Sequence, residues 1–395
     1  MLAWCSKTAV PALLGGANDH VVGGQKMKVL QLLPELKQGG VERGTVDTAR
    51  ALVTMGHESH VVSAGGSLVA QLEREGSSHH SIAVHRKRLS SLRSVKPLRQ
   101  LIVKLEPDII HVRSRLPAWL LRFALRGIPA AKRPKIVATF HGLYSVSFYS
   151  AIMGRADSVI AISDCVRRYI TENYPAVAAS KITTIYRGVD TAEFSAASAA
   201  PNLWLQELLD AQPALVGVPL VVMPGRLSPW KGQRTFLQLM AALKQSGVDC
   251  HGLIVGGPTP GKEHYQTELE ELAKKLGLTH KVSFLGQQSA MADIYRSASL
   301  VCNLSEHAEP FGRTVIESLA LGTPVLAWDE GGPSESLKSA FPQGLVVKDD
   351  LETLAQRAAQ ILEQQPRVNL PKAFTLETQI EQTVGVYSAL LESNV

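Results

Sequence analysis

Cysteine is scarce in this sequence. The four cysteines among 395 residues, Cys5, Cys165, Cys250 and Cys302, are scattered, with no C-x-x-C pair and no metal-ligand spacing. A disulfide framework or a zinc site would need paired or regularly spaced cysteines. The pattern therefore indicates reduced thiols and a cytoplasmic protein.

Long apolar runs are also missing. No stretch reaches the roughly 18–20 apolar residues that a membrane-spanning helix needs. Residues 1–26 are glycine-rich and of mixed polarity, and they lack the basic start and apolar core of a signal peptide. Because a buried-strand pattern follows at 27–33, we predict that 1–26 is a disordered extension and that Met27 is the natural start.

What the sequence does contain fits a globular protein. It is 45% hydrophobic and 19% charged, and its length suggests roughly two to three domains. The net charge of +6 is unevenly distributed, because the segment 85–135 holds fourteen lysines and arginines against only Glu106 and Asp108. Such a local excess of positive charge usually serves an anionic partner.

Short apolar strands alternate with amphipathic helices nearly throughout, which is typical of parallel sheets covered on both faces. Strands are predicted in the first half near 28–33, 58–63, 80–84, 108–112, 135–140, 157–162 and 181–185. The stretch 194–213, rich in Ala, Ser and Pro, is predicted to be an interdomain connection. Strands are then predicted near 219–223, 251–256, 281–285, 299–304, 324–328 and 344–347.

This pattern predicts two Rossmann-like, doubly wound α/β domains, at 27–197 and 198–378. A final helix, 379–395, is expected to pack back on the first domain. Open parallel sheets bind ligands beyond the carboxyl ends of their strands. We therefore expect the site in a cleft between the two domains.

The strongest chemical signal is the stretch from Asn303 to Ser318. Glu309 ends a loop after a strand, and Glu317 lies eight residues later inside a helix that begins near Gly312. Backbone amides at such a helix start favour a phosphate, and Gly312 leaves room for it to approach. The two carboxylates suit ribose and sugar hydroxyls, although surface glutamates on an amphipathic helix would show the same spacing.

A second signal follows the first strand of the second domain, where Arg226 and Lys231 lie in the stretch 224–232. A departing nucleoside diphosphate gathers negative charge that must be stabilised by a metal or by fixed cations. The sequence has no Asp-x-Asp metal motif. Arg226 and Lys231 are therefore the candidates, since Arg can fork across two phosphate oxygens while Lys supplies a point charge.

Together these motifs resemble the retaining enzymes of glycosyltransferase family 4, which have the two-domain GT-B fold. The resemblance runs from about Met27 to the C-terminus. The residues that carry it are Gly39-Gly40, His141, Arg226, Lys231 and Glu309 to Glu317 around Pro310-Phe311-Gly312. Supporting matches are Ala161-Ile162-Ser163, Arg187-Gly188-Val189-Asp190, and Gly331-Gly332 with Glu335.

The resemblance implies an acceptor-binding first domain, a donor-binding second domain and a role for each matching residue. Arg226 and Lys231 would bind the diphosphate, Glu317 the ribose and Glu309 the donor sugar. The amides of Phe311 and Gly312 would touch sugar hydroxyls, and those near Arg313 and Thr314 would face phosphate. Gly39 and Gly40 would let the first-domain loop close on the diphosphate, and His141 would face the reacting sugar, unless it is only a buried structural histidine.

The implied reaction keeps the anomeric configuration and needs no cofactor and no metal, only the nucleotide-diphosphate sugar as co-substrate, with UDP-sugars favoured. The acceptor would be attacked from the leaving-group face, and the departing phosphate oxygen would help to take its proton. Two positions depart from the family pattern or add to it. Arg187 stands where Asn is often found, and Arg313 could either contact phosphate or be solvated.

The basic segment 85–135 contains helical patterns, 92–105 and 116–125, with an apolar side that includes Trp119 and with Arg and Lys around it. Such helices can rest on an anionic lipid surface. We expect peripheral binding at the cytoplasmic membrane and an anionic lipid-linked glycan acceptor, such as lipopolysaccharide core. A solvated basic face is the alternative, and nucleic acid is not expected because no aromatic stacking platform interleaves the cations.

Three other activities compete with sugar transfer. A hydrolase would use Glu309 and Glu317 as its carboxylate pair, but it needs no cationic diphosphate site. A nucleotide-sugar epimerase of GT-B fold should lack the Arg226/Lys231 and Glu309/Glu317 sets. A non-catalytic sugar-nucleotide binding protein would keep the site without turnover.

Overall fold

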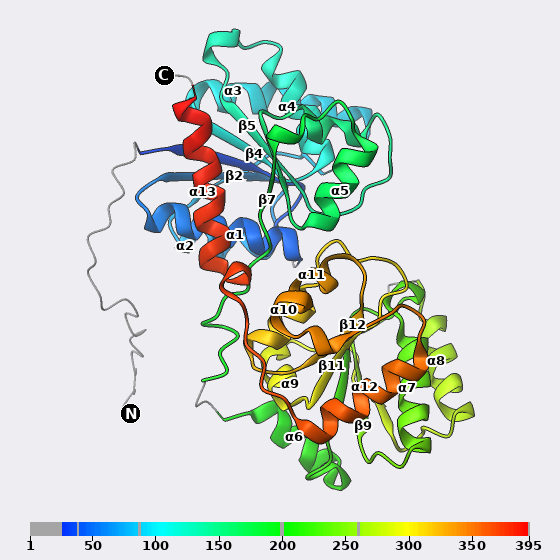
Figure 1. Cartoon of the computed structure of the whole chain (residues 1–395). Coiled ribbons are helices and arrows are strands. Elements are labelled where there is room, and N and C mark those ends of the chain that lie inside the picture. The colour runs from blue at the N-terminus through cyan, green and yellow to red at the C-terminus, as the bar shows by residue number, and fades with distance from the viewer. Residues whose placement is uncertain (1–25, 38, 86–87, 198–200, 259–260, 394–395) are drawn as a thin grey trace, which may run out of the picture.

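The computed structural model describes residues 26–37, 39–85, 88–197, 201–258 and 261–393. Figure 1 shows two α/β domains, one above the other, with a long helix running back to the first. The extension predicted at 1–26 lies, apart from Lys26, outside the described residues. The fold is therefore the predicted GT-B arrangement of two parallel-sheet domains.

The first domain is built on a seven-stranded parallel sheet with the order β3-β2-β1-β4-β5-β6-β7. Its strands are β1 Lys28–Leu32, β2 Glu58–Ser63, β3 Ser78–Ser81, β4 Ile109–Val112, β5 Lys135–Phe140, β6 Ser158–Ala161 and β7 Ile182–Thr184. Its helices are α1 Gly40–Thr54, α2 Val69–Arg74, α3 Val95–Leu105, α4 Arg115–Leu125 and α5 Asp164–Asn173. Most strands predicted from apolar runs are confirmed, and β4 and β6 are buried along their whole length. The strand predicted near 80–84 is β3, which lies earlier and is polar and not buried.

The second domain has a six-stranded parallel sheet with the order β10-β9-β8-β11-β12-β13. Its strands are β8 Leu220–Pro224, β9 His251–Val255, β10 Val282–Phe284, β11 Leu300–Asn303, β12 Val325–Trp328 and β13 Leu345–Val346. The helices are α6 Leu203–Ala211, α7 Gln233–Gln245, α8 His264–Lys275, α9 Met291–Ser297, α10 Arg313–Ala320, α11 Gly331–Ala340, α12 Leu351–Gln364 and α13 Leu376–Glu392. In both sheets the strand order reverses beside the first strand, which is where such folds bind ligands.

The connection predicted at 194–213 is more structured than its composition indicated, because it contains α6. Asn202 caps this helix by accepting a hydrogen bond from the backbone N–H of Leu205, at 2.9 Å. Its side chain also donates to Ser297 Oγ, at 2.8 Å, and so ties α6 to α9. The helix was missed because the neighbouring Ala, Ser and Pro residues hid its short apolar pattern.

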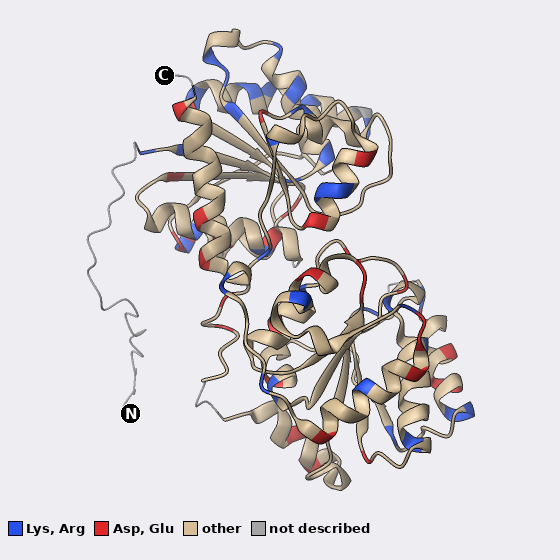
Figure 2. Ribbon diagram, in the orientation of Figure 1, with Lys and Arg blue, Asp and Glu red and all other residues tan. Residues whose placement is uncertain are grey.

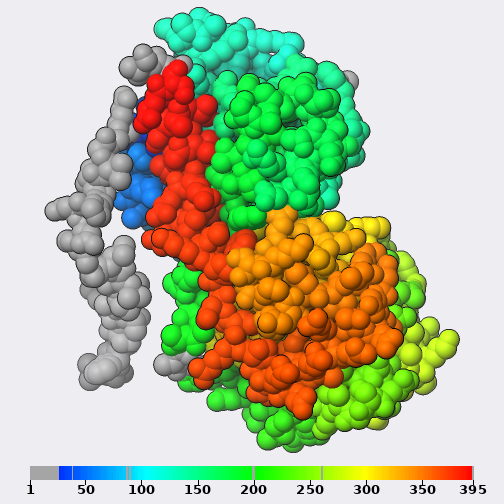
Figure 3. Space-filling view, viewed as in Figure 1, coloured from blue at the N-terminus to red at the C-terminus, as the bar shows by residue number. Residues whose placement is uncertain are grey.

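Helix α13 leaves the second domain and packs against the first, as the red helix in Figures 1 and 3 shows. Tyr387 is fully buried against Val29, Ile109 and Val137 of the first sheet. Its hydroxyl group lies 2.6 Å from His111 Nδ1. The helix therefore completes the apolar cover of the first domain.

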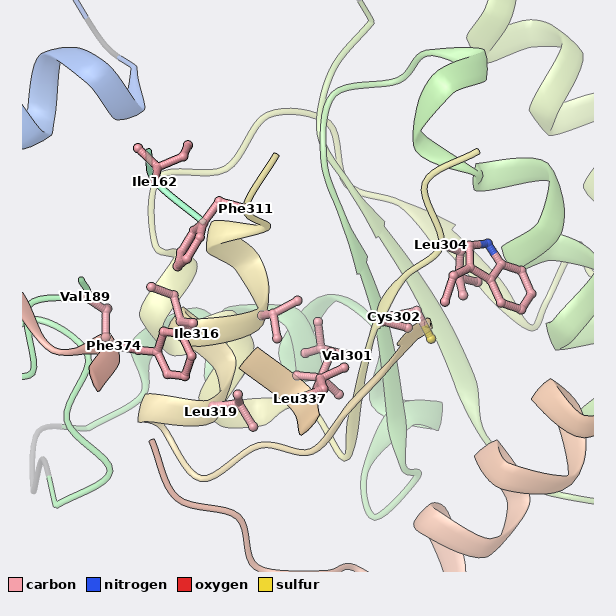
Figure 4. Close-up of a cluster of buried hydrophobic side chains, with 14 of the residues drawn as sticks. Ile162, Val189, Val301, Cys302, Leu304, Phe311, Ile316, Leu319, Leu337 and Phe374 are labelled. Atoms are coloured by element: carbon pink, nitrogen blue, oxygen red, sulfur yellow. The ribbon is translucent and has the colours of Figure 1, made fainter. Parts of the chain in front are cut away.

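The two segments that cross between the domains lie side by side. Val189 exchanges backbone hydrogen bonds with the second crossing, through Phe374 O at 3.0 Å and Leu376 N at 2.9 Å. Gly188 is needed here, because a Cβ would lie 2.4 Å from Thr375 O. Figure 4 shows the apolar contact below the cleft, with Val189 beside Phe374. Both domains therefore meet at a defined, bonded junction.

Within the described residues, no helix combines the length and the apolar character that crossing a bilayer would require.

Candidate active site

The donor-side loop connects β11 to α10 and contains Glu309, Phe311 and Gly312. Gly312 adopts φ +84° immediately before α10, and a Cβ there would lie 2.6 Å from Pro333 Cγ. Only glycine meets both conditions without strain. The predicted helix start is therefore confirmed, and the first amides of α10 lie at the end of the loop, where helix geometry favours an anion.

Lys231 and Glu309 form an ion pair across this site. Lys231 Nζ lies 2.6 Å from Glu309 Oε1, which also accepts a hydrogen bond from the Ser305 hydroxyl group. The Glu309 side chain is 8% exposed and that of Lys231 is 25% exposed. Gly232 sets the turn after Lys231, since its φ is +78° and a Cβ would lie 1.8 Å from Leu304 O. Two residues that are 78 positions apart thus meet as a partly buried charge pair.

Glu317 faces a different cation. Arg313 Nη2 lies 2.9 Å from Glu317 Oε1, one helical turn apart, and Tyr295 OH lies 3.5 Å from Glu317 Oε2. Burial raises the pKa of Glu317, and the neighbouring Arg313 counteracts part of that effect. Arg313 is therefore an ion-pair partner of Glu317, so it is not simply solvated, and a contact with phosphate stays a prediction.

Arg226 and Thr314 are less closely tied to this centre. Arg226 follows β8 and is exposed, and among the described residues its guanidinium group makes no hydrogen bond or ion pair. Its backbone carbonyl group accepts from Gln233 Nε2 at 3.1 Å. Thr314 Oγ1 accepts from Asn303 Nδ2 at 3.1 Å. Arg226 is thus free to turn toward a ligand, whereas Thr314 already helps to fix the start of α10.

His141 follows β5 in the first domain and is half-buried in a positive environment, with its Nε2 atom turned away from solvent. Burial lowers its pKa well below the usual value, with further contributions from Arg187 and Arg113. Arg187 Nη1 lies 3.4 Å from His141 Nδ1, and because a guanidinium group only donates, Nδ1 accepts and the proton sits on Nε2. Nε2 has no hydrogen-bond partner among the described residues. A ligand hydroxyl group would satisfy this buried donor.

Arg187 is the site residue whose importance the sequence did not reveal. It is 7% exposed, and it donates to Gly40 O at the start of α1 as well as approaching His141. Burial and the charges of Arg313 and Arg113 lower its pKa to about 9. A Cβ on Gly44 would lie 2.5 Å from its Nη2, so α1 leaves space for it. Its place directly after a first-domain strand was the available signal.

Some of the predicted residues of both domains come together around one cavity of about 220 Å³. The predicted residues that do not line it are Gly39, Arg226, Lys231, Glu309, Thr314 and Glu317. Its lining is Gly40, Val41, His141, Ile162, Arg187, Pro310, Phe311, Gly312 and Arg313. Gly40 opens α1, and a Cβ on it would lie 3.4 Å from Arg313 Cδ. Gly39 precedes it in extended conformation, with φ 171°. The starts of α1 and α10 therefore approach one cavity from opposite domains.

The domains are held together beside this cavity by Glu335 of α11. Its carboxylate accepts from the backbone N–H groups of Asp164, at 2.8 Å, and Cys165, at 2.6 Å. These are the first residues of α5, where a negative charge is favourable. Ser163 donates to Pro310 O at 2.5 Å. The loop that carries Glu309 is thereby fixed to the first domain.

Within the described residues, no group of three or more His, Cys, Asp or Glu side chains is arranged to hold a metal ion. The groups that gather at the cleft are guanidinium, ammonium and imidazole donors with two paired carboxylates. Their chemistry suits an anion that bears hydroxyl groups.

Comparison with known families accounts for both domains. A model described as "Glycosyltransferase Family 4" matches residues 38–193, and one described as "Glycosyl transferases group 1" matches residues 206–378. Both matched models describe glycosyltransferases, and together they account for most of the chain. The chain is therefore a glycosyltransferase, and its cleft is the candidate site of transfer.

Individual relatives of this chain are also glycosyltransferases. The lipopolysaccharide core biosynthesis mannosyltransferase LpsB of Rhizobium meliloti is 28% identical over 288 residues, which cover 70% of this chain and 77% of that protein. Several D-inositol 3-phosphate glycosyltransferases also match, but the chain spans less than half of their length.

Two solved structures share the fold. A glycosyltransferase from Rickettsia africae has a TM-score of 0.78 at 28% identity, covering 93% of this chain and 99% of that one. HepE of Anabaena, in complex with UDP-glucose, has a TM-score of 0.72 at 23% identity, covering 92% and 100%. At that identity, the likeness to HepE shows the fold alone.

Proposed function

We propose that this glycosyltransferase moves a hexose from a nucleotide-diphosphate sugar, with UDP-sugars favoured, to a membrane-associated glycan and retains the anomeric configuration. The observation that carries the proposal is the arrangement of charge around the cleft. Lys231 lies 2.6 Å from the buried Glu309 in the second domain. His141 lines the cavity from the first domain with a buried, unpaired nitrogen.

In the proposed reaction the donor lies along the second-domain side of the cleft. Glu317 binds the ribose, and Lys231, Arg226 and the amides at the start of α10 bind the diphosphate. Glu309 and His141 contact hydroxyl groups of the sugar. As the bond from the anomeric carbon to the diphosphate oxygen breaks, the fixed cations stabilise the charge on the leaving group.

The acceptor hydroxyl group then attacks the same face that the diphosphate leaves. Its proton passes to the departing phosphate oxygen, so no side chain needs to act as a strong base. This fits a site in which the carboxylates are already paired with Lys231 and Arg313. The proposal requires neither a divalent cation nor an organic cofactor.

The membrane-associated acceptor is supported by charge and by a relative. Figure 2 shows lysines and arginines gathered at the end of the first domain that carries α3 and α4, far from the second domain. The related LpsB is described as a lipopolysaccharide core mannosyltransferase. We propose a lipid-linked anionic glycan, such as lipopolysaccharide core, as the acceptor, and binding to the inner surface of the cytoplasmic membrane.

The test is incubation of the purified chain with UDP-glucose, UDP-galactose, UDP-N-acetylglucosamine or GDP-mannose and a lipid-linked core acceptor, with chelator or with manganese. Transfer that survives the chelator and yields a product with the donor's anomeric configuration, seen by NMR, is expected. Release of free sugar, formation of an epimer, binding without turnover, or activity only with manganese would each contradict the proposal.

A further inference from the structure

A second and larger hollow lies in the first domain, between α4 and the 3₁₀ helix Ser150–Arg155, over the edge of β5. Its volume is about 770 Å³, within the range of ligand pockets. Its floor is apolar and is formed by Val112, Leu121, Leu125, Ala138, Ile152 and Met153. We call it the α4 groove. It shares no lining residue with the cavity between the domains.

The rim of the α4 groove is strongly positive. The basic residues that line it are Arg122, Arg126, Arg133, Lys135 and Arg155, and the acidic one is Asp157. Asp157 already accepts a hydrogen bond from the backbone N–H of Ile136, at 2.7 Å. In the described part of the chain, Arg122, Arg126 and Arg155 form no ion pair with a carboxylate. Burial lowers the pKa of Arg122, and the charges of Arg155 and Arg126 lower it further, because the three lie around one groove.

Exposed aromatic and apolar side chains flank the same rim. Phe148 is 72% exposed and Val146 is 59% exposed, on the loop after β5. The Phe148 ring lies 5.4 Å from that of Trp119 on α4 and 6.0 Å from the Arg155 guanidinium carbon. Apolar rings beside cations are typical of surfaces that meet the boundary between lipid headgroups and acyl chains.

We propose that the α4 groove binds one hydrocarbon chain of an anionic lipid, with the lipid phosphate held by Arg122, Arg126 and Arg155. An apolar floor under a ring of cations matches an amphiphile with one negative end. A nucleotide fits less well, since the floor offers no aromatic ring for a base to stack on. The proposal deepens the proposed membrane-associated acceptor by naming the contact with lipid.

The position of the groove suits this role. Ala138 lines the groove and His141 lines the cleft, and the two are joined by β5 and the residue after it. Three residues of extended chain span about 10 Å. Arg133 and Lys135 of the rim stand at the start of β5, the end away from His141, so a lipid held in the α4 groove would leave the cleft unblocked.

The test uses soluble alkyl phosphates below their micelle concentration, so that a specific site is measured without a membrane surface. Titration calorimetry with hexyl phosphate is expected to show one site per chain. Each additional methylene that enters the groove should tighten binding about fourfold, so octyl phosphate should bind about 15-fold more tightly than hexyl phosphate. Inorganic phosphate, which has the charge alone, should bind at least about 100-fold more weakly than octyl phosphate.

Two variants and a matched control locate the site. Arg122→Gln with Arg126→Gln and Arg155→Gln removes the phosphate contacts, and Ala131→Trp at the exposed mouth obstructs the chain while keeping every charge. Both should lose octyl phosphate binding by more than about tenfold. The control replaces Arg93, Lys96 and Lys104, exposed on the neighbouring segment 93–104, by Gln; it removes the same charge and should bind as the wild type does.

An equal loss of octyl phosphate binding in the variant that replaces Arg122, Arg126 and Arg155 and in the control variant would overturn the proposal, because diffuse charge alone would then explain binding. Unchanged binding by Ala131→Trp, or no dependence on chain length, would overturn it as well. The readout needs no sugar transfer. A chain that binds alkyl phosphates in this way but transfers no sugar would contradict the proposed function while leaving the groove assignment intact.

Discussion

The two walls of the cleft handle charge in opposite ways. On the second-domain wall two cations have a carboxylate partner, Lys231 with Glu309 and Arg313 with Glu317, and only Arg226 among the predicted cations there has none within the described residues. On the first-domain wall, His141 keeps an unpaired nitrogen and Arg187 lies among other arginines, with its pKa lowered to about 9. This difference indicates that ion pairs within the second domain hold the donor-binding side chains in place before a ligand binds. The first-domain wall retains positive potential for an incoming anion.

The largest expected effect is the loss of a pair on the donor wall. Lys231→Ala leaves the buried Glu309 carboxylate without its cation and removes a charge from the proposed leaving-group site. We expect kcat to fall about 10²- to 10³-fold, measured by transfer from the preferred nucleotide sugar. Arg234→Ala is the control, because Arg234 lies on the nearby α7 and forms an exposed pair with Glu268 of α8. A kcat within twofold of the wild type would show that the pair is not part of catalysis.

On the first-domain wall, Arg187 is expected to act as a positioning residue for His141 and the start of α1. Arg187→Gln should lower kcat by about 10- to 100-fold, and Arg187→Lys should recover part of that loss. Arg187 is the leading charged neighbour that lowers the pKa of His141. The acid limb of the pH–rate profile should therefore shift to higher pH in Arg187→Gln. An unmoved limb with a lowered kcat would reduce Arg187 to a structural role.

Two histidines with lowered pKa values also predict how stability depends on pH. Burial places the folded-state pKa of both His111 and His141 well below 6.5, so as pH falls below 6.5 the unfolded chain binds their protons first. Stability is then complete above about pH 6.5 and falls by about 1.4 kcal/mol per pH unit for each histidine. Urea unfolding at several pH values measures this slope. His141→Asn should reduce this slope by about 1.4 kcal/mol per pH unit, the share of one histidine. An unchanged slope would contradict a buried neutral His141.

The smallest expected effect concerns the contact that joins the two walls. Glu335→Ala removes the carboxylate that accepts from Asp164 and Cys165 at the start of α5. The closed cleft should become less favourable, so KM for the donor should rise about threefold to fivefold while kcat changes little. Lys338→Ala, an exposed residue on the same helix, is the control. A larger fall in kcat than rise in KM would indicate a direct role in the reaction.

Much of the fold could be predicted because a buried parallel strand shows in the sequence as a short apolar run. The predicted strand at 58–63 coincides with β2, and the final helix predicted at 379–395 overlaps α13, which begins three residues earlier at Leu376. Helix α6 was missed because the Ala, Ser and Pro residues around it hid its short apolar pattern. The site residues at strand ends were found as motifs, but Arg187 was noticed only as a departure from a family pattern.

What the sequence determined by itself is the alternation of strands and helices and the kinds of side chain at the strand ends, because both follow from short-range periodicity and motif chemistry. Only the tertiary structure decided which of these side chains meet. Lys231 and Glu309 are 78 residues apart, and Arg187 reaches Gly40 over 147. Such pairings depend on how the two sheets and the returning helix α13 pack. The apolar pattern of the sequence shows which residues are buried, but it does not show which distant residue each of them contacts.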